Sequence, residues 1–363
     1  MPKIKKVILP KDNRNHNLIV EWWYFNGHLY DNDNNHYSFM DCFFKVNISK
    51  IKIPFMTPYF DFMNNIFKNK KYIHFAHSVI SDIKTKKSYK EVQYISLLSK
   101  DSFKKGLLYI NYKNANLLDN TLNYEINEIS PNNFNIKTKN INLNLESKKR
   151  ALFEGGHGYV GKPESGSYYY SFTDLNILGK ISIKGKEVEV RGKGWMDHQW
   201  ADATYKGKKD KWTWFSFQME NGTEIMCVEY ESEQLGKDTL IDMIDKDGKQ
   251  TQYKNAEFFP LKNIWKSNKT KTEYPLSWNI NIPKIGINIK TNALMKDQEI
   301  IFGEINYWEG PIKVVLDING KKIKGVGYME LVGYPSDYNY LILESKEIKK
   351  NIKEKVKNVI RKF

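Results

Sequence analysis

Short runs in which apolar and polar residues alternate occupy most of the chain. They include EWWYFNGHLY, HYSFMDCFFKVNI and FNIKTKNINLNL early in the sequence, and KWTWFSFQM, EIIFGEINYWEG and KGVGYMEL later. Clusters of Asn, Asp, Gly and Lys separate the runs, and Asp247-Gly248 and Asn319-Gly320 are typical hairpin turn pairs. This pattern predicts an all-β protein whose antiparallel strands form sandwiches or barrels.

The length of the chain predicts more than one domain. Its 363 residues exceed the roughly 250 to 300 that one hydrophobic core usually supports. We expect a first β domain over 1–200 and a second over 201–344, with the polar stretch ADATYKGKKD as the junction. No repeat with a fixed period of about 20 to 50 residues is visible, which disfavours a propeller or a solenoid.

The end of the sequence changes period and predicts a cationic amphipathic helix over 345–363. Its apolar residues fall three or four positions apart, with Lys and Arg between them. They are Ile348, Ile352, Val356, Ile360 and Phe363. This stripe can pack on the second domain, or it can lie on an anionic membrane surface, and both readings stay open.

Charge and composition exclude some classes of binding partner but do not identify one. A net charge of +15 and a pI near 9.3 favour an anionic partner, although the coding bias of an AT-rich genome can also enrich Lys, Asn and Ile. No RNA-recognition strand motif or zinc finger is present, so we expect no nucleic-acid binding. No G-x-S-x-G elbow surrounds Ser216 or Ser232, which disfavours a serine hydrolase.

The two cysteines, Cys42 and Cys227, form no C-x-x-C pair and no cluster with His, so we expect buried thiols, no metal and no cofactor. Apolar runs are far shorter than the ~20 residues that cross a bilayer, and no export signal is visible. These features predict a cytoplasmic protein, and peripheral membrane contact through the terminal helix stays an open alternative.

Carboxyl, imidazole and indole groups are concentrated in a few strands. On the first, Glu21, Trp23 and Phe25 should point to one face, and Trp22, Tyr24 and Asn26 to the other. In the segment GWMDHQW, Asp197 and His198 stand between two tryptophans. A carboxyl desolvated against Trp has a raised pKa, which suits a general acid, and an indole face can stabilise a nearby cation.

Five of these strings resemble the carotenoid 1,2-hydratase and AttH-like family in order and spacing. They are EWWYFNGHL, HFAHSVISD, SYYYSFTDL, VRGKGWMDHQW and the pair YWEG with GVGYMELVGY, between Glu21 and Tyr334. The resemblance implies two lipocalin-like β domains with a cavity between or inside them. It also implies activities such as hydration of an isoprenoid double bond, including hydration of geranylgeranyl chains to hydroxyarchaeol, or a pericyclic cyclisation. Fold therefore does not fix the reaction.

The family's functional His-x-Trp matches His198 and Trp200. Its downstream Tyr-x-Asp is not cleanly reproduced, because Tyr230 is followed by Ser232, and this departure leaves the proton donor open. Our hypothesis is that Asp197 protonates an alkene, Trp200 and Trp23 flank the cation, and His198 with Tyr230 orients water.

The expected ligand is a hydrophobic isoprenoid or lipid. Further residues expected to bind it are Glu21, Trp23, Asn26, His77, Tyr169, Trp195, Trp214, Trp308 and Glu309. Three alternatives remain: a lipocalin-type carrier without chemistry, a cyclase of the same fold, and purely structural roles for these polar and aromatic groups.

Overall fold

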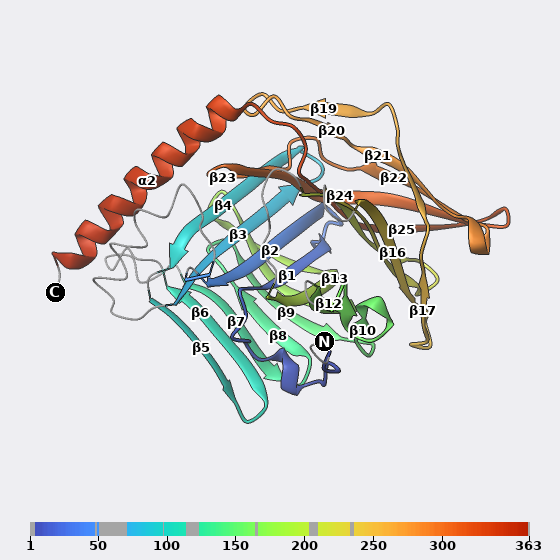
Figure 1. The fold of residues 1–363 in the computed structure, drawn as a ribbon, viewed down its shortest axis with the longest axis horizontal. Coiled ribbons are helices and arrows are strands. Elements are labelled where there is room, and N and C mark those ends of the chain that lie inside the picture. Colours follow the sequence, from blue (N-terminus) through green and yellow to red (C-terminus); the bar gives the residue numbers. More distant parts are fainter. Residues whose placement is uncertain are drawn as a thin grey trace.

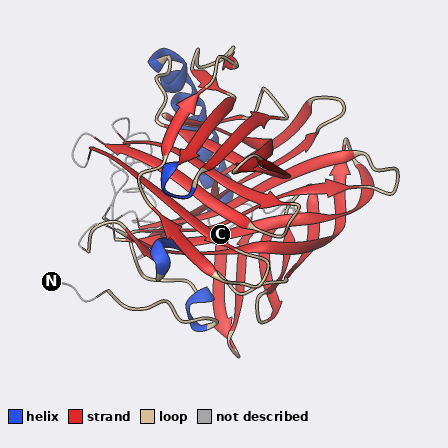
Figure 2. Cartoon of the chain, turned by 90° about the vertical axis from the view of Figure 1, so that its right-hand side faces the viewer, coloured by secondary structure: helices blue, strands red, loops and turns tan. Residues whose placement is uncertain are grey.

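The computed structural model describes residues 4–47, 49–50, 71–96, 98–113, 123–163, 166–202, 210–232 and 236–361. In this part of the chain nearly all regular structure is antiparallel strand, and two large curled sheets pack against each other (Figures 1 and 2). The predicted all-β class is confirmed. The two sheets divide between β13 and β14, but most of the predicted junction, 203–209, lies outside the described residues, and the domain bounds stay a prediction.

Thirteen strands of the first sheet lie within the described residues. In spatial order they are β4 (Lys87–Ser96), β3 (Tyr72–Asp82), β2 (His36–Asn47), β1 (Val20–Tyr30), β13 (Lys186–Ala201), β12 (Ser167–Ile183), β9 (Ile141–Ser147), β8 (Asn133–Lys137), β7 (Asn123–Ser130), β6 (Leu107–Lys113) and β5 (Leu98–Lys104). Two short strands, β10 (Leu152–Phe153) and β11 (Tyr159–Val160), pair with β12. The 3-10 helices η1 (Lys11–Asn13) and η2 (Glu154–Gly156) lie in the connecting segments.

In the part of the chain that the structure describes, the second sheet has ten strands. In spatial order nine are β17 (Gln250–Tyr253), β16 (Gly236–Ile244), β15 (Glu224–Ser232), β14 (Asp210–Met219), β25 (Lys321–Val332), β24 (Ile305–Ile318), β22 (Ile287–Ala293), β21 (Ser277–Ile282) and β18 (Glu257–Pro260). The tenth, β23 (Glu299–Phe302), pairs with β24. A separate hairpin joins β19 (Ile264–Lys266) to β20 (Glu273–Pro275), and η3 (Pro283–Ile285) precedes β22.

Strand alternation divides the described buried side chains among three hydrophobic cores. The first core lies on the inner, concave face of the first sheet and includes Trp23 and Phe25, and the second core, with Phe215 and Met329, lies inside the second sheet. A third group, here named the interface core, lies between the sheets. It includes Tyr24, Met40, Cys42, Tyr169, Trp195, Trp214, Tyr307 and Tyr328.

The hairpin of β24 and β25 turns at the predicted Asn319-Gly320 pair. Both residues have positive φ, 51° and 86°, which Asn and Gly adopt at lower cost than other residues. The two-residue turn sets the register of the whole hairpin, so Ile318 pairs with Lys321 and Glu309 pairs with Glu330.

The terminal helix α2 (Tyr338–Ile360) begins seven residues before the predicted start. The Asp337 side chain accepts a hydrogen bond from the Asn339 N–H at 2.9 Å, which caps the first turn. Leu341 and Ile348 are buried, and the helix contacts β4 and β23 (Figure 1). The side chains of Ile352, Val356, Ile360 and Phe363 lie outside the described residues. No described helix is long and apolar enough to cross a membrane.

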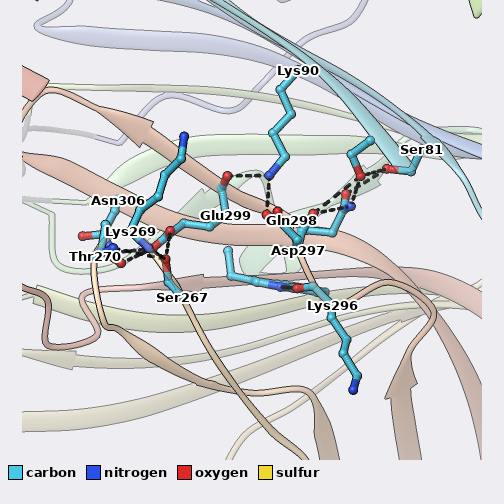
Figure 3. Close-up of polar contacts among 12 residues, drawn as sticks. Ser81, Lys90, Ser267, Lys269, Thr270, Lys296, Asp297, Gln298, Glu299 and Asn306 are labelled. Atoms are coloured by element: carbon cyan, nitrogen blue, oxygen red, sulfur yellow. Dashed lines mark hydrogen bonds and ion pairs between the residues drawn. The ribbon is translucent and has the colours of Figure 1, made fainter. Parts of the chain in front are cut away.

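A polar contact away from the interface core also joins the two sheets (Figure 3). Ser81 on β3 donates to Gln298 at 2.9 Å, and Lys90 on β4 donates to Asp297 at 2.7 Å and to the Glu299 carbonyl at 2.9 Å. The Glu299 carboxylate turns the other way and accepts from hydroxyl and amide donors near β19 and β20. The two sheets are therefore in contact at more than one place.

Candidate active site between the two sheets

Neighbouring residues of β1 and β13 face opposite sides of the first sheet. Trp195 belongs to the interface core, whereas Trp200 and Trp23 belong to the first core. Asp197 follows Trp195 by two positions and shares its face, while His198 shares the face of Trp200. The expectation that Asp197, His198, Trp23 and Trp200 act in one site is therefore not met, because the strand separates adjacent residues.

Asp197 lies at the interface and accepts hydrogen bonds from three neutral donors. The Tyr169 hydroxyl, the Ser171 hydroxyl and the Trp195 indole N–H each lie 2.6 Å from a carboxylate oxygen. Tyr169 in turn accepts from the Trp214 indole across the sheet interface at 3.1 Å. Burial raises the pKa of Asp197 to about 6, although these hydrogen bonds lower it.

Two further carboxyl groups, Glu309 and Glu330, face the interface from neighbouring strands of the second sheet. They are directly opposed in the β24–β25 register, which places their Cβ atoms roughly 4.5 to 5.5 Å apart. Glu309 is 4% exposed, and Glu330 keeps partial exposure to solvent. Among the described residues, no Lys, Arg or His forms an ion pair with either.

The environment of this carboxyl pair favours the protonated state. Burial and the neighbouring Glu330 raise the pKa of Glu309 well above its usual range, although the nearby Tyr24 hydroxyl lowers it. Burial raises the pKa of Glu330 to about 7, although a hydrogen bond from the Trp212 indole at 3.1 Å lowers it. The charge of Asp197 raises both values. Burial and the facing like charge therefore both favour the protonated form, and the two carboxyls titrate as a pair.

Several buried polar atoms at the interface have no partner in ordinary hydrogen-bond geometry among the described residues. They include Tyr24 Oη, Asn26 Nδ2, Ser38 Oγ, His77 Nε2 and Glu309 Oε1. The other nitrogen of His77 lies 2.6 Å from the Tyr307 hydroxyl. Buried polar groups are normally paired, so this concentration indicates a place where a ligand or water supplies the missing partners.

A second polar cluster lies on the opposite face, in the first core. Glu21 Oε1 lies 2.8 Å from His16 Nδ1 and 3.0 Å from His198 Nε2, and Lys45 Nζ is 3.6 Å from Oε2. Burial would raise the pKa of Glu21, but the neighbouring His16 and His198 rings lower it to about 2. Trp23 stacks on His198 at 4.8 Å between ring centroids. Ligand atoms of His16, Glu21 and His198 lie within 4.8 Å of one another, close enough to hold a metal ion.

The structure thus brings together some predicted site residues and separates others. Those at the interface are Asp197, Asn26, His77, Tyr169, Trp195, Trp214 and Glu309. Those on the inner face of the first sheet are His198, Trp200, Glu21 and Trp23.

Two predicted residues lie elsewhere. Trp308 points into the second core, where its indole donates to the Lys296 carbonyl at 2.7 Å. Tyr230 is partly exposed, and its polar neighbours are Asp210 and Ser232 rather than Asp197 or His198. Neither contact supports the predicted role in binding substrate or orienting water.

Glu330 was missed as a site residue, although a signal for it is present in the sequence. In a hairpin with a two-residue turn, paired positions have a constant sum. The position of the Asn319-Gly320 turn is therefore enough to pair Glu309 with Glu330 and to put both carboxyls on the same face. Two glutamates opposed within apolar strands are costly, which makes the pair a candidate for function.

Fold and sequence comparisons place the chain in a family. The AttH-like family profile matches residues 2–334, and the chain belongs to that family. A crystal structure of an AttH protein from Nitrosomonas europaea has a TM-score of 0.68 at 22% identity, covering 91% of this chain and 98% of that one. The predicted membership in the AttH-like family is confirmed.

Two proteins named for adding or removing water are also similar. The crystal structure of kievitone hydratase from Nectria haematococca has a TM-score of 0.65 at 14% identity and covers 90% of this chain and 93% of its own. Dehydratase asqC from Emericella nidulans is 22% identical over 203 residues, which are 52% of this chain and 57% of the relative. The match thus spans little more than half of that curated relative, and the two structural matches show a shared fold.

Proposed function

We propose that the protein is a hydro-lyase that adds water to a carbon–carbon double bond, with Glu309 and Glu330 as its acid–base pair. The observation that carries this proposal is the opposition of two carboxyls that have no basic partner among the described residues, in an interface where burial raises their pKa values. The names of kievitone hydratase and dehydratase asqC support the reaction class.

The proposed reaction uses one proton and returns it. Protonated Glu309 transfers its proton to one alkene carbon, so a C–H bond forms while the π bond breaks and the other carbon becomes cationic. Water forms a C–O bond to that carbon and gives a proton to Glu330, whose partial exposure puts it within reach of solvent. Proton transfer from Glu330 to the facing Glu309 restores the pair, and the reverse sequence removes water.

The aromatic groups around the pair would shelter the cation. Trp214 lies edge-on to Tyr24 at 5.7 Å and to Trp195 at 6.3 Å between ring centroids, so a cation among these rings is shielded from water. Asp197, held by Tyr169, Ser171 and Trp195, adds negative charge on the same side. This arrangement revises our first hypothesis, because the proton donor becomes Glu309 and Asp197 becomes a stabilising anion.

An isoprenoid chain is the substrate class that we propose. Such chains are apolar and yield tertiary cations on protonation, which the aromatic interface would accept. The resemblance to hydratases of carotenoids and of geranylgeranyl lipids favours this class, and the cationic helix α2 favours a substrate held in an anionic membrane. The hydroxyarchaeol-forming reaction is the particular case that we propose to test.

The test is mass spectrometry of lipids from a host that makes geranylgeranyl lipids and expresses the full chain. We expect a lipid species heavier by one water with the unaltered protein and with Glu220→Gln, which changes an exposed glutamate. We expect that species to disappear with Glu309→Gln.

Two outcomes would contradict the proposal. Unmodified lipid that co-purifies with the protein, without any mass change, would identify a carrier. A lipid of unchanged mass but altered retention would identify a cyclase, in which the same proton starts ring closure instead of hydration.

A further inference from the structure

The cluster on the inner face of the first sheet has no part in the proposed hydration. His16, Glu21 and His198 offer two imidazole nitrogens and one carboxylate oxygen, all within 4.8 Å of one another. Two histidines and one carboxylate are a ligand set of zinc sites that keep a fourth position for water. The sequence alone predicted no metal here, because His16, Glu21 and His198 have no recognisable metal-site spacing.

A chain of hydrogen bonds fixes the tautomer of His198. The Asn13 amide donates to Glu128 at 2.7 Å, so its oxygen accepts from the Tyr170 hydroxyl, also at 2.7 Å. Tyr170 has then used its single proton and accepts from His198 Nδ1–H at 3.0 Å. In the neutral ring, Nε2 of His198 therefore directs a lone pair toward Glu21 Oε1, 3.0 Å away.

Two lone pairs that face each other at this distance repel, unless a proton or a metal ion lies between them. Both atoms are buried, with side-chain exposures of 0% for His198 and 1% for Glu21. His16 Nδ1 lies 2.8 Å from the same carboxylate oxygen and can supply a third ligand. We propose that His16, Glu21 and His198 bind one divalent transition-metal ion, with zinc(II) as the ion that best suits these ligands.

The surroundings of the cluster are consistent with such an ion. Trp200 lies parallel to the His16 ring at 4.0 Å and Trp23 stacks on His198, so both imidazoles are held in place. Tyr170 on Nδ1 of His198 is the outer partner that metal-binding histidines usually have. His16 is 13% exposed, which leaves a route for an ion to enter.

The charges around the proposed metal site leave room for one divalent cation. Glu21 is paired with Lys45 at 3.6 Å, and the Asp12 carboxylate lies 3.7 Å from the free Nε2 of His16. With neutral imidazoles these three charged groups sum to one negative charge. A divalent ion reverses that sign and leaves one positive charge, so we expect affinity to be moderated by Lys45.

Metal binding at this site would have a structural consequence. His16 belongs to the segment before β1, and the other two ligands lie on β1 and β13. An ion that binds only the folded chain would fasten this segment to the first sheet and raise the melting temperature in proportion to its free concentration.

The test uses the full chain, without a histidine tag and stripped of metal by a chelator. Calorimetric titration with zinc(II) and visible absorption of cobalt(II) report stoichiometry, affinity and ligand type. We expect one ion per chain and a higher melting temperature. We also expect His16→Ala and Glu21→Gln to weaken binding by more than the roughly 10- to 100-fold that loss of an outer partner costs. His157→Ala, which removes an exposed histidine, should leave binding unchanged.

The variants also distinguish loss of metal binding from loss of folding, and they test the metal site separately from the proposed hydration. His16→Ala changes a partly exposed side chain, and circular dichroism of each variant shows whether it is folded. The absence of binding by the unaltered chain would overturn the proposal. Equal affinity in folded His16→Ala, Glu21→Gln and His157→Ala proteins would also overturn it. Neither result bears on Glu309 and Glu330, which belong to the second sheet and face the opposite side of the first sheet.

Discussion

The two faces of the first sheet bury carboxyl groups in opposite electrostatic settings. On the inner face, Glu21 is surrounded by His16, His198 and Lys45, and its pKa is lowered to about 2. On the interface side, Glu309 and Glu330 meet each other and aromatic donors, and their pKa values are raised. Burial is similar for Glu21 and Glu309, at 2% and 4% exposure, so partners decide the charge.

This contrast separates two chemical uses of a buried acid. Glu21 is a permanent anion at neutral pH and can hold a cation in place. The raised pKa of Glu309 favours its protonated form, which is the property required of a general acid.

The largest effect should follow removal of the interface carboxyls. Replacing a general acid or base typically costs 10²- to 10⁴-fold in rate, and we expect Glu309→Gln and Glu330→Gln each to lose roughly this much. The measurement is the initial rate of hydrated lipid formation per folded protein. A rate within about threefold of the unaltered enzyme for both variants would mean that the pair is not the acid–base centre.

Removal of the inner carboxylate should instead reduce stability. Glu21→Ala leaves Lys45 buried without its carboxylate, and breaking a buried ion pair from one side costs about 3–5 kcal/mol. Glu309→Gln replaces a neutral acid by a neutral amide and should cost far less. Denaturant unfolding compares the two free energies. Equal losses would show that both carboxyls are ionised.

The pH dependence of stability should identify the interface group. In the unfolded chain Glu330 has a pKa near 4.5, and in the folded chain about 7, so the unfolded chain loses its proton first. Stability is therefore fully present below pH 4.5 and falls by up to about 3 kcal/mol as pH rises toward 7. We expect Glu330→Gln to flatten this decline above pH 5, and Glu21→Gln to leave it unchanged. Parallel curves for all three proteins would contradict the assignment.

The smallest effect should come from a donor at the interface. Tyr169→Phe removes the hydroxyl that donates to Asp197 and accepts from Trp214, and a hydrogen bond to a charged group is worth about 1.5–3 kcal/mol. The pKa of Asp197 should rise, and with it the more acidic limb of the pH–rate profile. Tyr168→Phe, on the other face of the same strand, is the matched control and should leave the profile in place.

Much of the fold follows from the sequence because strand alternation and turn residues are local signals. The opposite orientation of Trp23 and Tyr24 was predicted and is confirmed, as is the turn at Asn319-Gly320. The helix start was displaced because the apolar run after Asp337 was not recognised as helical, although Asp337 is an ordinary N-cap.

The candidate site was harder to predict because it joins strands that are distant in sequence. The same alternation that places Trp23 and Tyr24 on opposite faces also separates Asp197 from His198, but the resemblance to a His-x-Trp motif favoured grouping them. The pairing of Glu309 with Glu330 follows from the turn alone. The approach of Asp197 to that pair depends on how the two sheets pack, which no local pattern specifies.

We expect an interface carboxyl to remain protonated at neutral pH, and infrared difference spectroscopy measures this directly. The spectrum of the unaltered protein minus that of Glu309→Gln at pH 7 should contain the C=O stretch of a protonated carboxylic acid. That band should shift when glutamate is labelled with ¹³C. A difference spectrum with only ionised carboxylate bands would show that Glu309 has lost its proton, and it would contradict the proposal that Glu309 is the general acid.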